Sequence, residues 1–108
     1  MKELQNDLNN TLEILENGLK NGVVNFSFEK KDGSWRNAWG TRNTEIIETV
    51  DGVLPKGTGG EKTNTIAYWD LESCGWRALR QENLIDVWKV LSKEEFVEIL
   101  REQNIKDL

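Results

Sequence analysis

Leucines recur along the N-terminal part of the chain at the spacing of an α-helix. Successive members are separated by four, four, three and four residues, so they lie on one stripe of a helix. The members are Leu4, Leu8, Leu12, Leu15 and Leu19. The pattern predicts an amphipathic helix over residues 3–20, ended by Asn21-Gly22 in the left-handed conformation common at helix termini. We expect this helix to cover one side of a sheet or barrel, and a partner-binding helix is the alternative.

From Val23 the apolar residues recur with a period of two instead. The segment VVNFSFEK, residues 23–30, alternates apolar and polar side chains, which is typical of a half-buried strand. Asp32-Gly33 follows, and this pair is a strong signal for a hairpin. The returning strand is then SWRNAWGTR, residues 34–42.

Three further segments are rich in β-branched and aromatic residues and are separated by turn-like sequences. They are NTIAYWD at 64–70, GWRALRQ at 75–81 and LIDVWKV at 84–90. Five short strands are expected to close into a small barrel, because closure removes exposed edges. Ser92 and Glu95 then have the spacing of a capping box, which predicts a second helix to about Asn104. The predicted fold class is mainly β, a small five-stranded barrel with an N-terminal and a C-terminal α-helix.

The length of 108 residues and the apolar content of 37% favour a single domain over residues 1–108. Its expected parts are a helix at 1–22, a barrel at 23–90 and a helix at 91–108. The long connection at 43–63 joins the second and third strands, and we interpret it as a functional flap or a merely mobile loop.

The net charge is −5, but its distribution is uneven. Each end contributes −2, and residues 23–90 hold nine bases and ten acids, which leaves room for a local basic patch.

Several function classes lack the residues that they need. The chain has no histidine and one cysteine, Cys74, which excludes imidazole-based catalysis, an internal disulfide and a cysteine-rich zinc site. The acids lack the spacing of a metal or acid–base motif, and Asp70 and Glu72, which flank a turn, are expected to be solvated charges. We therefore expect no enzyme, no metal and no cofactor. No apolar run approaches the roughly 20 residues of a membrane span, and we expect a cytoplasmic protein without a membrane partner.

Five tryptophans fall in the strand region, and a small barrel does not have room for all of them. Alternation along the second strand places Trp35 and Arg36 on opposite faces, and alternation along the fourth places Trp76 and Arg80 opposite Arg77. We expect at least one tryptophan at a surface near an arginine, an arrangement that stacks flat rings and binds phosphate. The alternative is core packing with arginines that extend to solvent.

The stretch DGVLPKGTGGEKTN, residues 51–64, has two glycines at the spacing of a phosphate-binding P-loop. In a P-loop a lysine and then a hydroxyl residue follow the second glycine, whereas here Thr58 follows Gly57 and Lys56 precedes it. We therefore do not expect an ATPase. The stretch is either a mobile connection or a flap whose amides, with Lys56 and Lys62, close over an anion.

Residues 66–87 read IAYWDLESCGWRALRQENLIDV, and a strand with Tyr-Trp-Asp is followed there by a turn and a second strand with Trp-Arg. The residues that carry the pattern are Tyr68, Asp70, Trp76, Arg77 and Arg80. This run resembles the WYL family of Sm-like, SH3-type β-barrels, and with the preceding hairpin it is similar to the small stand-alone branch in phages and bacteria. Leu79 stands in place of the usual phenylalanine and Asn83 in place of a second arginine. The resemblance implies an Sm-like barrel that senses nucleic acid or nucleotide-like anions.

Together these features predict a non-enzymatic binding module for a nucleotide, a cyclic nucleotide or a short single-stranded nucleic acid, such as a phage-encoded sequestering or regulatory protein. The alternative is a protein–protein interaction module, such as an acidic phage inhibitor of a host defence protein, and homo-oligomerisation stays open. The predicted ligand-binding residues are Arg77, Arg80, Trp76, Tyr68, Arg36, Lys56, Gly57 and Thr58.

Overall fold

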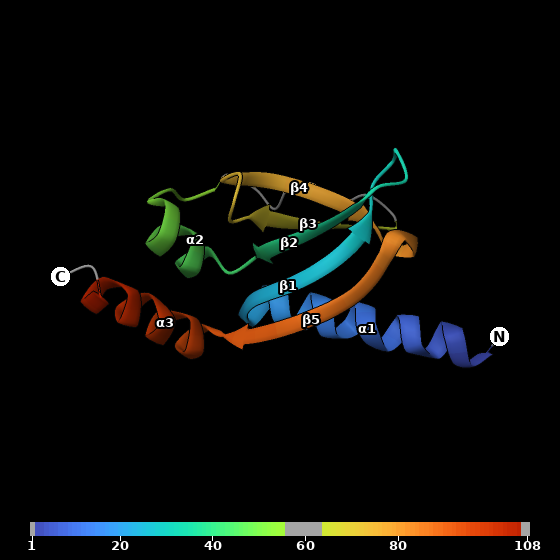
Figure 1. The fold of residues 1–108 in the computed structure, drawn as a ribbon, viewed down its shortest axis with the longest axis horizontal. Helices are drawn as coiled ribbons and strands as arrows, with labels where there is room; N and C mark the ends of the chain where they lie inside the picture. The colour runs from blue at the N-terminus through green and yellow to red at the C-terminus, as the bar shows by residue number, and fades with distance from the viewer. Residues whose placement is uncertain (1, 56–63, 107–108) are drawn as a thin grey trace.

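The computed structural model describes residues 2–55 and 64–106, and side chains over residues 8–55 and 64–103. A helix leads into five strands, and a second long helix follows them (Figure 1). The elements are α1 (Lys2–Asn21), β1 (Gly22–Glu29), β2 (Trp35–Thr41), α2 (Thr44–Asp51), β3 (Thr65–Asp70), β4 (Gly75–Arg80), a 3₁₀ helix (Gln81–Asn83), β5 (Leu84–Ser92) and α3 (Lys93–Lys106). The predicted order of helix, five strands and helix is confirmed.

The five strands form one antiparallel sheet in the order β4-β3-β2-β1-β5. β1 pairs along its length with β2, with Phe28 opposite Arg36. Within the described residues β2 pairs with β3 only at Gly40–Asp70 and Thr41–Trp69. Toward Trp35 the two strands therefore diverge, and this divergence opens the sheet on one side. α2 and α3 lie near the opposite end of the sheet from the β1–β2 turn (Figure 1).

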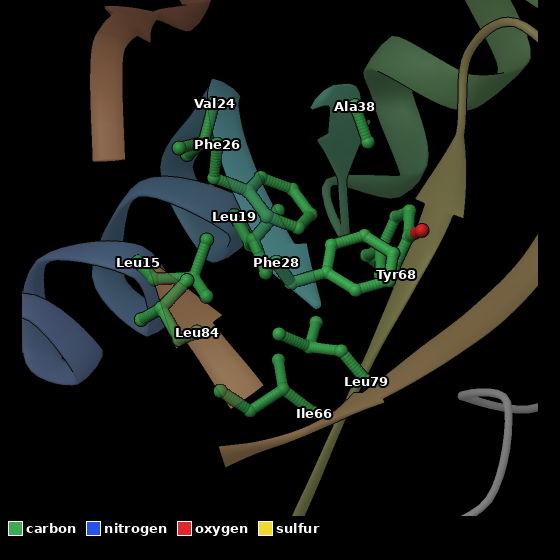
Figure 2. Close-up of a cluster of buried hydrophobic side chains, with 10 residues drawn as sticks. All are labelled: Leu15, Leu19, Val24, Phe26, Phe28, Ala38, Ile66, Tyr68, Leu79 and Leu84. Atoms are coloured by element: carbon green, nitrogen blue, oxygen red, sulfur yellow. The ribbon is translucent and has the colours of Figure 1, made fainter. Parts of the chain in front are cut away.

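The core lies between the concave face of the sheet and α1. Leu15 and Leu19 of α1 are fully buried against the aromatic residues of β1, as Figure 2 shows. The rings of Phe26 and Tyr68 meet edge to face with their centroids 5.0 Å apart. The leucine stripe thus covers the sheet as expected. None of the helices in the described part of the chain is long and apolar enough to cross a membrane.

Two predicted local signals form as expected. In the β1–β2 turn Gly33 has a φ of 84°, and the backbone N–H of Lys30 donates to the carbonyl of Ser34. At the start of α3 the N–H of Glu95 donates to Ser92 Oγ, and the N–H of Ser92 donates to Glu95 Oε1, both at 3.1 Å. This reciprocal pair is the capping box, and hydrogen bonds to the carboxylate from the backbone N–H and the side chain of Ser92 lower the pKa of Glu95.

The expectation that Asn21-Gly22 adopts a left-handed helix cap was wrong. Gly22 is the first residue of β1, and among the described glycines only Gly33 and Gly52 have a positive φ. Glycine is needed at position 22 because a Cβ there would lie 1.9 Å from the carbonyl oxygen of Leu91. The close approach of β5, rather than a helix terminus, explains this residue.

The first part of the connection at 43–63 forms a helix that the sequence did not predict, α2, whereas residues 56–63 lie outside the described residues. The side chain of Asn43 caps this helix by accepting a hydrogen bond from the N–H of Ile46, and Gly52 ends it with a φ of 69°. Ile46 and Ile47 are buried. The signal was present as Asn43 before two isoleucines, but the segment is only two turns long.

Candidate functional site

A cleft of about 590 Å³ occupies the opening where β2 and β3 diverge. One wall is the end of the β1–β2 hairpin, from Phe28 to Lys31 together with Arg36. The other wall is formed by Tyr68 of β3 and by consecutive β4 residues, 76–80. Its volume lies within the range of about 300–1,000 Å³ that is common for small-molecule sites.

The charged side chains that line the cleft are mostly basic. The charged ones are Lys30, Lys31, Arg36, Arg77, Arg80 and the single acid Glu29. Two further carboxylates pair with these arginines, Asp70 with Arg36 and Glu82 with Arg80. Five positive and three negative charges leave a local charge of +2, whereas the whole chain carries −5. A concave surface with this charge attracts anions in spite of the acidic protein around it.

Tyr68 is the largest fully buried side chain, and its ring forms part of the core. It fits beside β2 because residue 40 is glycine, where a Cβ would lie 2.7 Å from Cδ2 of Tyr68. The Tyr68 hydroxyl lies on the side of its ring that faces away from Leu15 and Leu19 (Figure 2). No atom in the described part of the chain hydrogen-bonds to this oxygen. Burial raises the pKa of Tyr68 to about 12, with Arg36 opposing the shift, so the hydroxyl is protonated at neutral pH.

Trp76 is the second aromatic residue in the wall, and it is half-buried. Its ring meets that of Trp69 edge to face, with centroids 5.6 Å apart. The indole Nε1 of Trp69 donates to Asp51 Oδ2 at 2.6 Å, which ties α2 to β3. The Nε1 of Trp76 is buried without a hydrogen-bond partner among the described residues. Within the described residues, both buried side-chain groups that lack a hydrogen-bond partner thus belong to residues that line the cleft.

Asp70 is fully buried, so the expectation of a solvated charge was wrong. Its Oδ2 pairs with Arg36 and lies 3.6 Å from Nε of Arg77. Its Oδ1 accepts hydrogen bonds from the backbone N–H groups of Glu72 and Ser73, at 2.9 Å and 3.2 Å. A carboxylate in this position is buried because its charge is paired and both oxygens are hydrogen-bonded. Asp70 therefore holds two arginines from different strands at the cleft and closes the β3–β4 turn.

Comparison with known proteins places this geometry in a family. Residues 12–85 match the family described as WYL_2, with an Sm-like SH3 β-barrel fold. The chain belongs to this family. It is also 40% identical over 76 residues to an uncharacterized 11.5 kDa protein from the Gp31-cd intergenic region of Enterobacteria phage T4, over 69% of this chain and 74% of the phage protein. No solved structure matches. The predicted family and fold class are thereby confirmed.

Five of the predicted ligand-binding residues of this WYL_2 chain line the cleft. They are Tyr68, Trp76, Arg77, Arg80 and Arg36. The other three, Lys56, Gly57 and Thr58, lie outside the described residues, as does the proposed flap lysine Lys62. Sequence reasoning missed Lys30 and Lys31, which line the cleft from the hairpin. Their signal was two adjacent lysines before the Asp-Gly turn.

The tryptophans of the WYL_2 barrel divide between core and surface. Trp69 is 8% exposed, whereas Trp35 is 71% exposed and Trp88 is 59% exposed. Trp35 precedes Arg36 in β2, but successive residues of a strand point to opposite faces, so this exposed ring does not share a face with that arginine. The expected arrangement of a surface tryptophan near an arginine stays a prediction.

The thiol of Cys74 lies outside the cleft lining. Its Sγ is 3.4 Å from Asp51 Oδ1, and this hydrogen bond raises the pKa of Cys74. A raised pKa disfavours the thiolate that a nucleophilic cysteine requires. The described residues contain no group of three acids and cysteines that could hold a metal ion.

Proposed function

We propose that this WYL_2 barrel is a non-enzymatic module that binds a phosphate-bearing ligand in its cleft, either a nucleotide, a cyclic nucleotide or a short single-stranded nucleic acid. The observation that carries the proposal is the buried Tyr68 hydroxyl, which has no partner among the described residues and belongs to a side chain that lines the same cleft as Arg36 and Arg77. A buried polar group without a partner costs about 1–3 kcal/mol. A ligand oxygen that accepts from this hydroxyl would remove that cost.

The chemistry of the wall favours a ligand rich in acceptors. The protonated Tyr68 hydroxyl, the indole N–H of Trp76 and the basic side chains are all hydrogen-bond donors at neutral pH. Phosphate oxygens are acceptors, and guanidinium groups bind them in a planar, bidentate manner. Asp70 orients Arg36 and Arg77 before a ligand arrives, which reduces the entropy that binding must overcome.

The non-enzymatic part of the proposal rests on the residues of the cleft. Among the described lining residues the sole carboxylate is Glu29, on the hairpin, and there is no thiol. Many acid–base and nucleophilic sites pair such a group with a second one, and the described lining offers Glu29 no second carboxylate or thiol. A protein that holds a nucleotide without converting it suits a sequestering or regulatory role, and the similarity to a phage protein makes a phage-encoded role of this kind part of the proposal.

Calorimetric titration with nucleotides, cyclic nucleotides and short oligonucleotides tests the proposal. We expect binding at about 50 mM salt that weakens steeply toward about 200 mM. Arg77→Gln should weaken binding and reduce the slope of log affinity against log salt by about 1. Arg101→Gln removes the same charge from the exposed surface of α3, outside the cleft, and should leave both quantities unchanged. Absence of binding across the panel, or equal effects of the two variants, would overturn the proposal.

A protein-binding role is the second candidate, because exposed apolar side chains gather on α1 and β5. Ile14, Trp88 and Val90 are between 44% and 59% exposed. Ile14 and Val90 line a second, shallower hollow between α1 and the end of β5. Purification of the tagged protein from its native host tests this role. A stoichiometric protein partner that is lost in Val90→Lys, together with no bound nucleotide, would favour it over the first candidate.

A further inference from the structure

The side chain of Trp35 lies at the end of the hairpin that forms one wall of the cleft. Trp35 is the first residue of β2 and pairs with Glu29, the last residue of β1. The next residue, Arg36, lines the cleft. Because successive residues of a strand point to opposite faces, Arg36 faces the cleft and Trp35 faces the outer side of the same hairpin. Lys30 and Lys31 lie in the turn between these two sides.

The outer face beside Trp35 is polar, so the structure does not use this ring for packing. Asn25 Nδ2 donates to Asn37 Oδ1 at 2.7 Å, and Asn37 Nδ2 donates to Ser27 Oγ at 3.0 Å. The Trp35 ring is 71% exposed at the edge of this cluster. An exposed indole next to basic side chains is the combination with which proteins hold single-stranded nucleic acid, with bases on the ring and phosphates on the cations.

We propose that Trp35 stacks on an unpaired base of a single-stranded nucleic acid whose phosphates occupy the cleft. The inference rests on the proposed function and narrows it to a ligand longer than one nucleotide. A strand leaving the cleft passes Lys30 and Lys31 before it reaches Trp35. Glu29 opposite Trp35 and Asp32 in the turn offset the charges of these two lysines. The charge that favours a polyanion over a neutral or basic partner is therefore the excess of bases over acids in the cleft as a whole, where the phosphates would lie.

Trp88 is a weaker candidate although it is also exposed. Its indole N–H donates to Ser27 Oγ at 2.7 Å, so its polar group is already satisfied. Asp86 is exposed and pairs with Ser27 in the adjacent strand, where its carboxylate would repel a phosphate. Trp88 therefore serves as the control for loss of an exposed ring.

The test compares two probes, thymidine monophosphate and an oligothymidylate of about eight nucleotides, which lies within the site size of single-strand binders. Affinities are measured by calorimetry at about 50 mM salt. We expect Trp35→Ala to weaken the oligomer about 5- to 150-fold and to leave the mononucleotide unchanged. Trp35→Phe keeps an aromatic ring and should retain most of the affinity. Trp88→Ala should bind both probes as the unsubstituted protein does.

Three results would overturn the inference. An oligomer affinity unchanged in Trp35→Ala would show that the ring does not contact the strand, and an equal loss in Trp88→Ala would show that the effect is not local. Equal affinity of the unsubstituted protein for both probes would show that the ligand ends within the cleft, which leaves the proposed function intact. A fourth such result is binding of neither probe. The proposed function itself fails only if the whole panel of nucleotides, cyclic nucleotides and oligonucleotides also shows no binding, so the two failures are distinguishable.

Discussion

Replacement of Tyr68 by phenylalanine should stabilise the free protein. Tyr68 is fully buried, and its ring packs on Phe26 and Phe28, with centroid distances of 5.0 Å and 6.3 Å. Phenylalanine keeps these contacts and the fit against Gly40, so only the hydroxyl is lost. Because no described residue hydrogen-bonds to that hydroxyl, its removal should raise the free energy of unfolding by about 1–3 kcal/mol. For a protein of this size each kcal/mol corresponds to about 4–8 °C in the melting temperature.

The assay is urea and thermal unfolding of both proteins, followed by circular dichroism. The same substitution should weaken a phosphate-bearing ligand about tenfold or more, because a hydrogen bond to a charged group contributes about 1.5–3 kcal/mol. Higher stability combined with lower affinity is the signature of a hydroxyl reserved for a ligand. A destabilised Tyr68→Phe protein would refute the reasoning, since it would show that the hydroxyl is already satisfied, for example by a buried water.

Titration of Tyr68 checks the same environment independently. Burial raises its pKa to about 12 in the folded protein, whereas an unfolded chain titrates near about 10. Between these values the folded state holds the proton and the unfolded state releases it. The contribution to stability is therefore intact below about pH 10 and falls by about 1.4 kcal/mol per pH unit toward pH 12. Since the chain has one tyrosine, phenolate absorbance reports this residue alone. A midpoint near the ordinary value in the folded protein would contradict the burial argument.

Three further substitutions test the fold by chemical denaturation. Asp70→Asn keeps the acceptor of the β3–β4 turn but removes the charge that faces Arg36. We expect the free energy of unfolding to fall by about 2 kcal/mol, less than for a fully buried pair because that arginine is 24% exposed. An unchanged stability would show that the pair is only a surface contact. Gly22→Ala places a Cβ against the carbonyl of Leu91 and should cost about 3 kcal/mol; a neutral effect would mean that β1 and β5 separate freely. Ser92→Ala removes the α3 cap and should cost about 1 kcal/mol, whereas Ser92→Thr should retain most of it.

Local signals predicted most of the secondary structure because each depends on residues only a few positions apart. The leucine stripe defined α1, the Asp32-Gly33 pair defined the hairpin turn, and Ser92 with Glu95 defined the start of α3. The missed helix α2 shows the limit of this reasoning. Its two turns are too short for apolar positions to repeat, and the burial of its isoleucines depends on other elements.

Features that depend on distant residues could not be predicted in this way. Gly22 resembled a helix cap until the carbonyl of Leu91 was placed beside it. In the sequence Asp70 resembles a solvated turn residue, whereas in the structure it pairs with Arg36 and Arg77 from neighbouring strands. In both cases the residue type indicated a special role, but the contacts that explain this role come from another strand.

The sequence by itself determined the order of the elements, the family resemblance and the supply of basic and aromatic side chains in the strand region. Only the tertiary structure decided which of these side chains share a surface. The divergence of β2 from β3 on the Trp35 side of Gly40 brings Arg36, Tyr68 and Arg77 to one cleft, and alternation along β2 leaves Trp35 on the outer face. The physical reason is that strand pairing and its interruption are set by contacts between segments far apart in the chain, whereas alternation within a strand fixes only the face on which each side chain lies.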